Sequence, residues 1–155
     1  MNSTGSSFVY VTYIRTTPER LWQALTEPEF TRQFWADTVQ DCDWKVGSSW
    51  KLMIPDGRVA DAGEVLEIEP HRRLVLSWQN QFKPELKAEG FSRLVYSLEQ
   101  QGEMVKLTVT HQIGRPGSQF IEKVSGGWPI ILSSLKSLLE TGESLEATRR
   151  WPEGI

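Results

Sequence analysis

The chain has few of the residues that build metal sites and covalent chemistry. Of its 155 residues, one is cysteine and two are histidine. The single thiol, Cys42, cannot form an intramolecular disulfide or a cysteine-rich zinc site. Its neighbours Asp41 and Asp43 disfavour the thiolate that a nucleophile requires. The sequence has no His-x-x-x-His pair, phosphate-binding glycine loop or Gly-x-Ser-x-Gly elbow. We therefore expect neither a metal nor a cofactor.

Basic clusters and long apolar runs are also missing. The net charge is -3 at pH 7, and Lys and Arg are dispersed along the chain. A nucleic-acid-binding surface would need them gathered in a patch or stripe. No stretch reaches the roughly 20 apolar residues of a membrane span, and the polar start MNSTGSSF does not resemble a signal peptide. These absences predict a cytoplasmic protein whose partners are neither nucleic acid nor membrane.

Tryptophan is the residue present in excess, with seven copies. A chain of this length suits one domain, and such a domain buries about 68–70% of its unfolded surface without help from metals or disulfides. Large aromatic side chains either fill a wide core or line an apolar pocket. The tryptophan content is compatible with both uses.

Hydrophobic periodicity predicts an α+β domain. Six segments alternate with the period of a strand, and three have helical spacing with proline or serine at their start. The strands are expected at 8–15, 48–54, 58–69, 73–78, 91–100 and 104–113, and the helices at 17–26, 27–35 and 118–125. Five consecutive strands with short turns indicate a six-stranded curved antiparallel sheet. Gly63 within a strand suggests a bulge or bend.

A further helix of about 13 residues is expected near the C-terminus. Pro129 and the glycines before it predict a kink or break between 118–125 and this helix. The helix should end at Gly142 and cross the concave face of the sheet, which is too wide for two short helices. The domain would then span 8–142, with 1–7 and 143–155 as flexible tails.

A set of motifs resembles a known superfamily. These motifs are 18-PERLWQALTEPE-29, Phe34-Trp35, 46-VGSSWKLMIPDGRVADAGEVLEIEPHRRLVLSW-78, 107-LTVTHQ-112 and 126-GGWPIILSSLKSLLETG-142. They are similar to the helix-grip (SRPBCC) superfamily of START-type, birch-pollen-allergen-like and polyketide cyclase-like proteins. More narrowly, they resemble bacterial homologues of the activator of the heat-shock-protein-90 ATPase. The resemblance covers roughly 8–142 and implies a helix-grip fold with a cavity between the last helix and the sheet. Gly47-Ser48 departs from the paired glycines frequent in that family.

Strand alternation and the helical stripe select the side chains that face this interior. The candidate cavity residues are Trp50, Leu52, Leu76, Trp78, Tyr96, His111, Trp128, Leu132 and Leu135. The alternative is that these side chains meet the helix and leave no void. For His111, the sequence leaves open a place at the cavity rim or a hydrogen bond to backbone at the strand end.

Three functions follow from these features. The favoured one is binding of a small apolar, aromatic or lipid-like molecule. The second is a cyclase- or hydratase-like enzyme using Tyr96 and His111, with Arg93, Asp61 and Glu64 as further polar groups. The third, implied only by the resemblance, is interaction with a chaperone. A homodimer is also predicted, because exposed aromatics such as Trp151 and Phe82 need cover.

Overall fold

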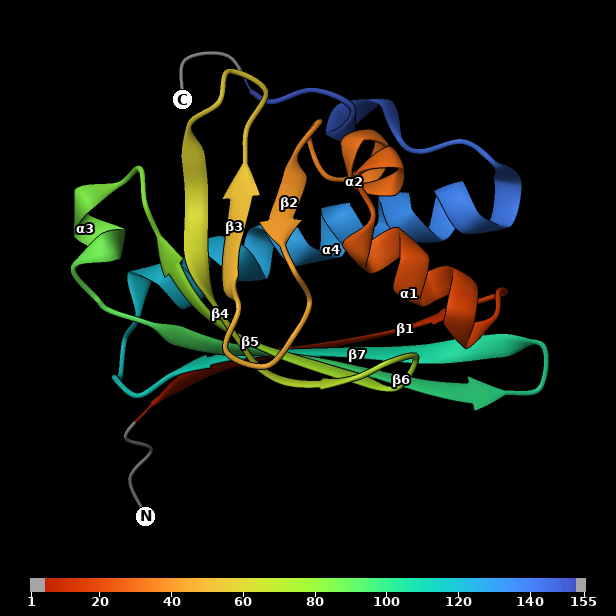
Figure 1. Ribbon diagram of the computed structural model, residues 1–155, viewed down its shortest axis with the longest axis horizontal. Coiled ribbons are helices and arrows are strands. Elements are labelled where there is room, and N and C mark those ends of the chain that lie inside the picture. The colour runs from red at the N-terminus through yellow and green to blue at the C-terminus, as the bar shows by residue number, and fades with distance from the viewer. Residues whose placement is uncertain (1–4, 153–155) are drawn as a thin grey trace.

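Seven antiparallel strands form one curved sheet in the computed structural model, which describes residues 5–152 (Figure 1). The strands are β1 (Ser6–Ile14), β2 (Val39–Cys42), β3 (Ser49–Met53), β4 (Val59–Glu69), β5 (Arg73–Asn80), β6 (Ser92–Gln101) and β7 (Met104–Ile113). Their order is β1-β7-β6-β5-β4-β3-β2. The predicted meander and the α+β class are confirmed, but the prediction of six strands is wrong.

The strand that the sequence failed to reveal is β2. It has four residues, and its inward-facing residue is the polar Gln40 rather than an apolar one. Both ends of the Gln40 amide are hydrogen-bonded: Nε2 donates to the Leu25 carbonyl at 2.6 Å, and Oε1 accepts from Trp50 Nε1 at 2.9 Å. A buried polar group is tolerated when its hydrogen bonds are made. The strand therefore lacks the apolar alternation by which sequence patterns detect strands.

Helices cover the concave face of the sheet. They are α1 (Pro18–Thr26), α2 (Pro28–Phe34), α3 (Pro84–Lys87) and α4 (Gln119–Thr141), followed by the 3-10 turn η1 (Glu146–Thr148). Figure 1 shows α4 running along the concave side while β2, β3 and β4 rise in front of it, so that the sheet wraps around the helix. No helix within residues 5–152 is long and apolar enough to cross a membrane.

Of the kink or break predicted at Pro129, the break is wrong, because α4 is one continuous helix of 23 residues. Proline inside a helix costs about 3 kcal/mol through the lost N–H and steric conflict. Buried apolar residues on both sides of Pro129 offset this cost: Phe120 and Ile121 precede it, and Leu132 and Leu135 follow it. The expected stop at Gly142 is confirmed, since that residue caps α4 with φ of +87°.

The start of α4 is fixed to the turn before β6. Ser118 caps the helix by accepting from Ile121 N at 3.0 Å. Glu89 accepts from Ser118 Oγ at 2.5 Å and from Gln119 N at 2.9 Å. A carboxylate at a helix N-terminus also interacts favourably with the helix dipole. These bonds hold the first turn of α4 over the end of the sheet where the candidate site lies.

The sheet contains two register shifts, and irregularities of this kind bend the strand that carries them. One lies between Leu52 and Met53 where β3 pairs with β4, and the other between Val65 and Glu67 where β4 pairs with β5. Gly63, where the sequence suggests a bulge or bend, pairs in regular register with Trp50 of β3, whereas residues 63 and 64 of β4 have no assigned partner on β5. The close approach of β5 explains why residue 63 has no side chain. A Cβ at this position would lie 1.8 Å from the Ser77 carbonyl oxygen of β5.

Residues 144–151, expected in a flexible tail, pack against the domain. Ser144 and Thr148 are buried. Thr148 Oγ1 lies 2.6 Å from Ser134 Oγ on α4, and the Thr148 carbonyl accepts from Ala36 N at 2.6 Å. The segment is thereby held at both α4 and the end of α2. Residues 1–4 and 153–155 of the expected tails lie outside the described residues.

Candidate functional site

A pocket of about 450 Å³ lies between the N-terminal half of α4 and the inner face of the sheet, close to α3. Its walls are mainly aromatic and aliphatic. They consist of Trp35, Leu52, Asp61, Trp78, Asn80, Phe82, Lys83, Leu86, Phe120, Lys123, Val124, Gly127, Trp128, Ile131 and Trp151. Pockets of this size and composition suit small organic ligands.

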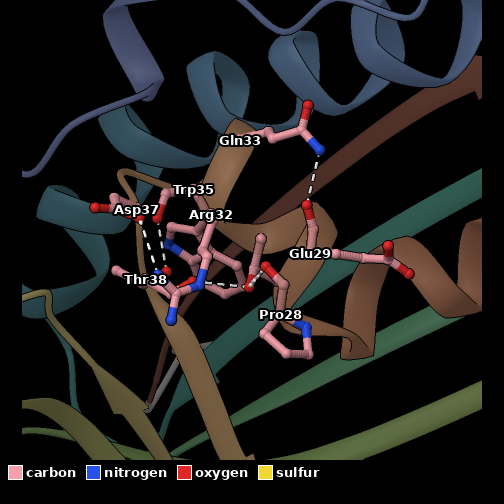
Figure 2. A network of polar contacts seen from close by, with 8 residues as sticks. Pro28, Glu29, Arg32, Gln33, Trp35, Asp37 and Thr38 are labelled. Carbon is pink, nitrogen blue, oxygen red and sulfur yellow. Dashed lines mark hydrogen bonds and ion pairs between the residues drawn. The ribbon is translucent and has the colours of Figure 1, made fainter.

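Trp35 enters the pocket from the turn after α2, which a local polar network holds in place (Figure 2). Thr38 Oγ1 donates to the Trp35 carbonyl at 2.6 Å, and Thr31 Oγ1 donates to the Thr38 carbonyl at 2.8 Å. Arg32 and Asp37 form an exposed ion pair at 3.8 Å, with Asp37 at a positive φ of 59°. The turn therefore fixes the indole at the pocket wall through its backbone.

The floor of the pocket is a cluster of indole rings around Trp78. The ring centroids of Trp35 and Trp128 each lie 5.9 Å from that of Trp78, and the Trp50 ring lies at 4.4 Å behind it. Stacked, tilted and edge-on contacts at these distances add to the stability gained by burial. The cluster gives the site a rigid aromatic surface, with Trp50 in the core rather than at the wall.

One carboxyl group, that of Asp61, lies in this apolar wall. Asp61 pairs with Leu52 of β3 and Asn80 of β5, so its side chain shares the inner face with pocket residues. It is 8% exposed, and no Lys or Arg among the described residues forms an ion pair with it. Burial raises the pKa of Asp61 from 3.8 to about 7, although the side chains of Trp78 and Asn80 lower it in part.

The groups around Asp61 are hydrogen-bond donors. Asn80 Oδ1 accepts from the backbone N–H groups of Phe82 and Lys83 at 3.2 and 2.9 Å, so the amide orientation is fixed and its NH2 group remains to serve Asp61. The Trp78 indole N–H approaches the same carboxyl but has no hydrogen-bond partner of normal geometry among the described residues. The carboxyl is thus poorly neutralised and retains unused hydrogen-bonding capacity.

His111 is fully buried beneath the pocket, with both ring nitrogens occupied. Trp128 Nε1 donates to Nδ1 at 3.1 Å, so the ring proton is on Nε2, which donates to Ser92 Oγ at 2.8 Å. Ser92 Oγ in turn donates to the Trp78 carbonyl at 2.9 Å. Burial lowers the pKa of His111 from 6.5 to about 3. Burial thus keeps the imidazole neutral, and the hydrogen bonds leave neither nitrogen free to act as a base.

A family model agrees with this architecture. The model for activator of Hsp90 ATPase homolog 1-like proteins matches residues 15–140, which is most of the chain. The chain belongs to this family. A search of curated proteins gave no match.

Solved structures of other chains share the fold of this family member. A protein from Mesorhizobium loti, MLL2253, is 25% identical with a TM-score of 0.74, covering 87% of this chain and 97% of its own. The Aha1 dimer from Colwellia psychrerythraea is 20% identical with a TM-score of 0.70, covering 90% of this chain and 99% of its own. CalU16 from Micromonospora echinospora is 21% identical with a TM-score of 0.69, covering 88% and 77%.

Of the nine cavity residues expected for this homologue of the activator family, three line the pocket: Leu52, Trp78 and Trp128. The other six are buried in the core beside it: Trp50, Leu76, Tyr96, His111, Leu132 and Leu135. The sequence left two locations open for His111, at the cavity rim or hydrogen-bonded to backbone. Neither includes the hydrogen bonds that its ring makes with the side chains of Ser92 and Trp128. Among residues 5–152, no group of His, Cys, Asp or Glu side chains is arranged to hold a metal ion.

Several wall residues were not expected from the sequence. Phe120, Val124, Gly127 and Ile131 follow the helical spacing of one α4 face. The expected break at Pro129 hid this spacing, because it divided the stripe between two helices. Trp35, Phe82 and Trp151 come from turns and the C-terminal segment, where no periodicity marks the inner side. Phe82 and Trp151, expected to be exposed, contact each other edge-on at 5.8 Å.

Tyr96 is buried against Trp128, and its hydroxyl has no hydrogen-bond partner among the described residues. Burial raises the pKa of Tyr96. An unsatisfied buried hydroxyl costs about 1–3 kcal/mol, so Tyr96→Phe should increase the free energy of unfolding by about 1 kcal/mol in urea titrations. Tyr13→Phe, at an exposed position, should leave it unchanged. A clear loss of stability in Tyr96→Phe would contradict the absence of a partner.

A larger hollow of about 620 Å³ lies elsewhere, between the start of α1 and the β4–β5 turn. Its walls are mostly charged or polar, including Glu19, Glu69 and Arg72, and His71 lies at its edge in an exposed turn. Arg72 and Glu69 already pair with each other at 3.1 Å. The apolar pocket is therefore the better candidate for binding an organic ligand.

Proposed function

We propose that this protein binds a small apolar or aromatic molecule in the pocket between α4 and the sheet. The observation that supports this most directly is the aromatic wall formed by Trp35, Trp78 and Trp128 beside Gly127. Apolar ligands gain affinity by leaving water for such a surface, at roughly 25 cal/mol per Å² of buried apolar area. Few polar groups interrupt the wall, so shape and apolar contact provide the main affinity.

The glycine at the pocket is consistent with this proposal. Gly127 lies within α4, where glycine is about 1 kcal/mol less favourable than alanine. A Cβ added there would meet no atom within 4 Å, so the position does not need glycine for packing. Its missing side chain leaves space in the pocket wall. Gly126, one residue earlier, has the same freedom but does not line the pocket.

The alternative enzyme function receives less support. An acid–base role for Tyr96 and His111 requires contact with a substrate, and neither residue lines the pocket. His111 also has both nitrogens engaged. The homodimer and the chaperone partner stay predictions. Phe82 and Trp151, on which the sequence argument for a dimer rested, cover each other, whereas the Colwellia psychrerythraea relative is described as a dimer.

Binding can be tested with the neutral fluorescent probe N-phenyl-1-naphthylamine. We expect saturable enhancement of probe fluorescence and quenching of tryptophan emission. Gly127→Leu should reduce probe affinity at least about tenfold, because its side chain occupies the pocket. Gly126→Leu is the matched control: it makes the same change in helix propensity at an exposed position of α4. Both variants should be at least as stable as the parent protein in thermal melts, because each replaces a helical glycine.

Two results would contradict the proposed function. One is the absence of saturable probe binding to the parent protein. The other is equal loss of binding in Gly126→Leu and Gly127→Leu, which would place the probe on the outside of α4. Selective loss in Gly127→Leu supports the pocket.

A further inference from the structure

Asp61 distinguishes this pocket from a purely apolar one, and what it recognises can be argued from its surroundings. The inference rests on the proposed function. A buried carboxyl usually has a cationic partner or a full set of hydrogen bonds. Asp61 is 8% exposed and has no ion pair among the described residues, and the nearby Trp78 N–H is itself without a partner. The unpaired charge lies in the wall of a pocket that an organic molecule can enter.

The second observation is the aromatic composition around the carboxyl. Indole and phenyl faces attract cations through their quadrupole, and aromatic walls beside a carboxylate are a common way to recognise organic ammonium groups. The pocket contributes Trp35, Trp78, Trp128 and Phe82 as such faces. One of them already attracts a cation: Lys83 Nζ lies 5.8 Å from the Phe82 ring centroid. The walls therefore suit a positive charge better than a negative one.

From these two observations we infer that the pocket takes an aromatic or apolar molecule bearing a protonated amine, with the ammonium group placed at Asp61 and the body against the indole cluster. The ammonium group supplies the charge and the N–H donors that Asp61 lacks. The carboxylate then accepts hydrogen bonds from the ligand on one side and from the Asn80 amide on the other. This assigns Asp61 as the residue that selects ligand charge.

The other charged groups at the pocket do not replace this partner. Lys83 and Lys123 line the pocket from the α3 turn and from α4, and Lys123 is exposed. Neither contributes to the pKa shift of Asp61. Leu52 of β3 and Trp78 and Asn80 of β5 carry no charge. Beneath the floor, burial keeps the pKa of His111 at about 3, so it is neutral at the pH of the experiment.

The test compares three naphthalene probes of similar shape: 2-(1-naphthyl)ethylamine, 1-naphthylacetate and 1-ethylnaphthalene. Each is titrated at pH 8 as a competitor of N-phenyl-1-naphthylamine. We expect the amine to bind at least about tenfold tighter than the ethyl compound, and the acetate to bind weakest, since desolvated charge pairs contribute more than a neutral contact. In Asp61→Asn the ratio of amine to ethyl affinity should approach one.

The matched control is Glu64→Gln, which removes a carboxylate from the same strand at an exposed position outside the pocket. It should keep the preference for the amine. The preference should also weaken below pH 7, by up to about tenfold per pH unit, because protonated Asp61 has no charge to offer. A pH-independent preference would contradict the assignment of Asp61.

Other outcomes separate this inference from the proposed function. If all three probes bind equally, the pocket is real and the inference about charge is wrong. If the acetate binds best and loses affinity in Lys83→Gln or Lys123→Gln, the inference is overturned in favour of an anionic ligand. If neither N-phenyl-1-naphthylamine nor any naphthalene probe binds, the proposed function fails and the inference falls with it.

Discussion

Replacing Gly63 with alanine is expected to lower the free energy of unfolding by at least about 3 kcal/mol, the range of severe overpacking in a core. The reason is the close approach of β4 and β5. The new Cβ would lie 1.8 Å from the Ser77 carbonyl oxygen and 2.5 Å from its carbonyl carbon. These are backbone atoms of a central strand, so no side-chain rotation relieves the overlap. The two strands would have to separate where Ser77 Oγ accepts the Glu64 N–H at 2.9 Å.

Urea denaturation of the variant measures this loss. Gly126→Ala provides a contrasting glycine, because its Cβ would meet no atom within 4 Å. That variant should gain up to about 1 kcal/mol from helix propensity. Combining Gly63→Ala with Ser77→Gly should not restore stability, since the clash is with backbone. Restoration by Ser77→Gly, or a loss of less than about 1 kcal/mol in Gly63→Ala, would show that the strands are not so close.

Strand alternation predicted the inner face well because its period depends only on backbone geometry. Trp50, Leu52, Leu76, Trp78 and Tyr96 all face inward as their spacing indicates. Alternation shows which side chains face inward but not how close they lie to the pocket. It therefore could not distinguish residues of the pocket wall from residues buried in the core. Whether a residue lines the pocket depends on what α4 covers. That depends on contacts between segments far apart in the sequence.

The errors have a common physical origin in tertiary contacts that override local preferences. Pro129 does not end α4, because both halves of the helix are anchored in one core. Gln40 faces inward in β2 because its amide forms hydrogen bonds with the Leu25 carbonyl and the Trp50 indole N–H. In the sequence, Asp61 is only one of several polar groups on the predicted strands. Its importance arises because no Lys or Arg among residues 5–152 forms an ion pair with it, which no local pattern records.

The pH dependence of stability should reveal Asp61 and His111 as two opposing buried groups. Asp61 has a pKa of 3.8 when unfolded and about 7 when folded, so the folded protein holds an extra proton between these values. Its contribution to stability is full below pH 3.8 and is lost as the pH rises towards 7 and beyond. The folded state of His111 has a pKa of about 3, against 6.5 when unfolded. Its contribution is full above pH 6.5 and is lost as the pH falls towards 3.

Between about pH 4 and 6.5 the two effects have opposite signs, each with a slope of up to about 1.4 kcal/mol per pH unit. They should therefore largely cancel in the parent protein. Replacing Asp61 leaves the contribution of His111 to the pH dependence of stability without its opposing effect. From pH 4.5 to 6.5, the free energy of unfolding of Asp61→Asn should rise relative to the parent by about 2–3 kcal/mol. That of His111→Gln should fall relative to the parent over the same interval.

Urea titrations of the parent, both single variants and the double variant at pH 4.5, 5.5 and 6.5 measure these slopes. Differences from the parent remove the contribution of surface carboxylates such as Glu67 and Glu140, which all four proteins share. The double variant should again follow the parent, because both linked protons are gone. If the free energy of unfolding of Asp61→Asn changes with pH in the same way as that of the parent, the Asp61 carboxyl is not held protonated by its burial. The ligand would then find an ionised Asp61 even at acidic pH, and the expected loss of amine preference below pH 7 would disappear with it.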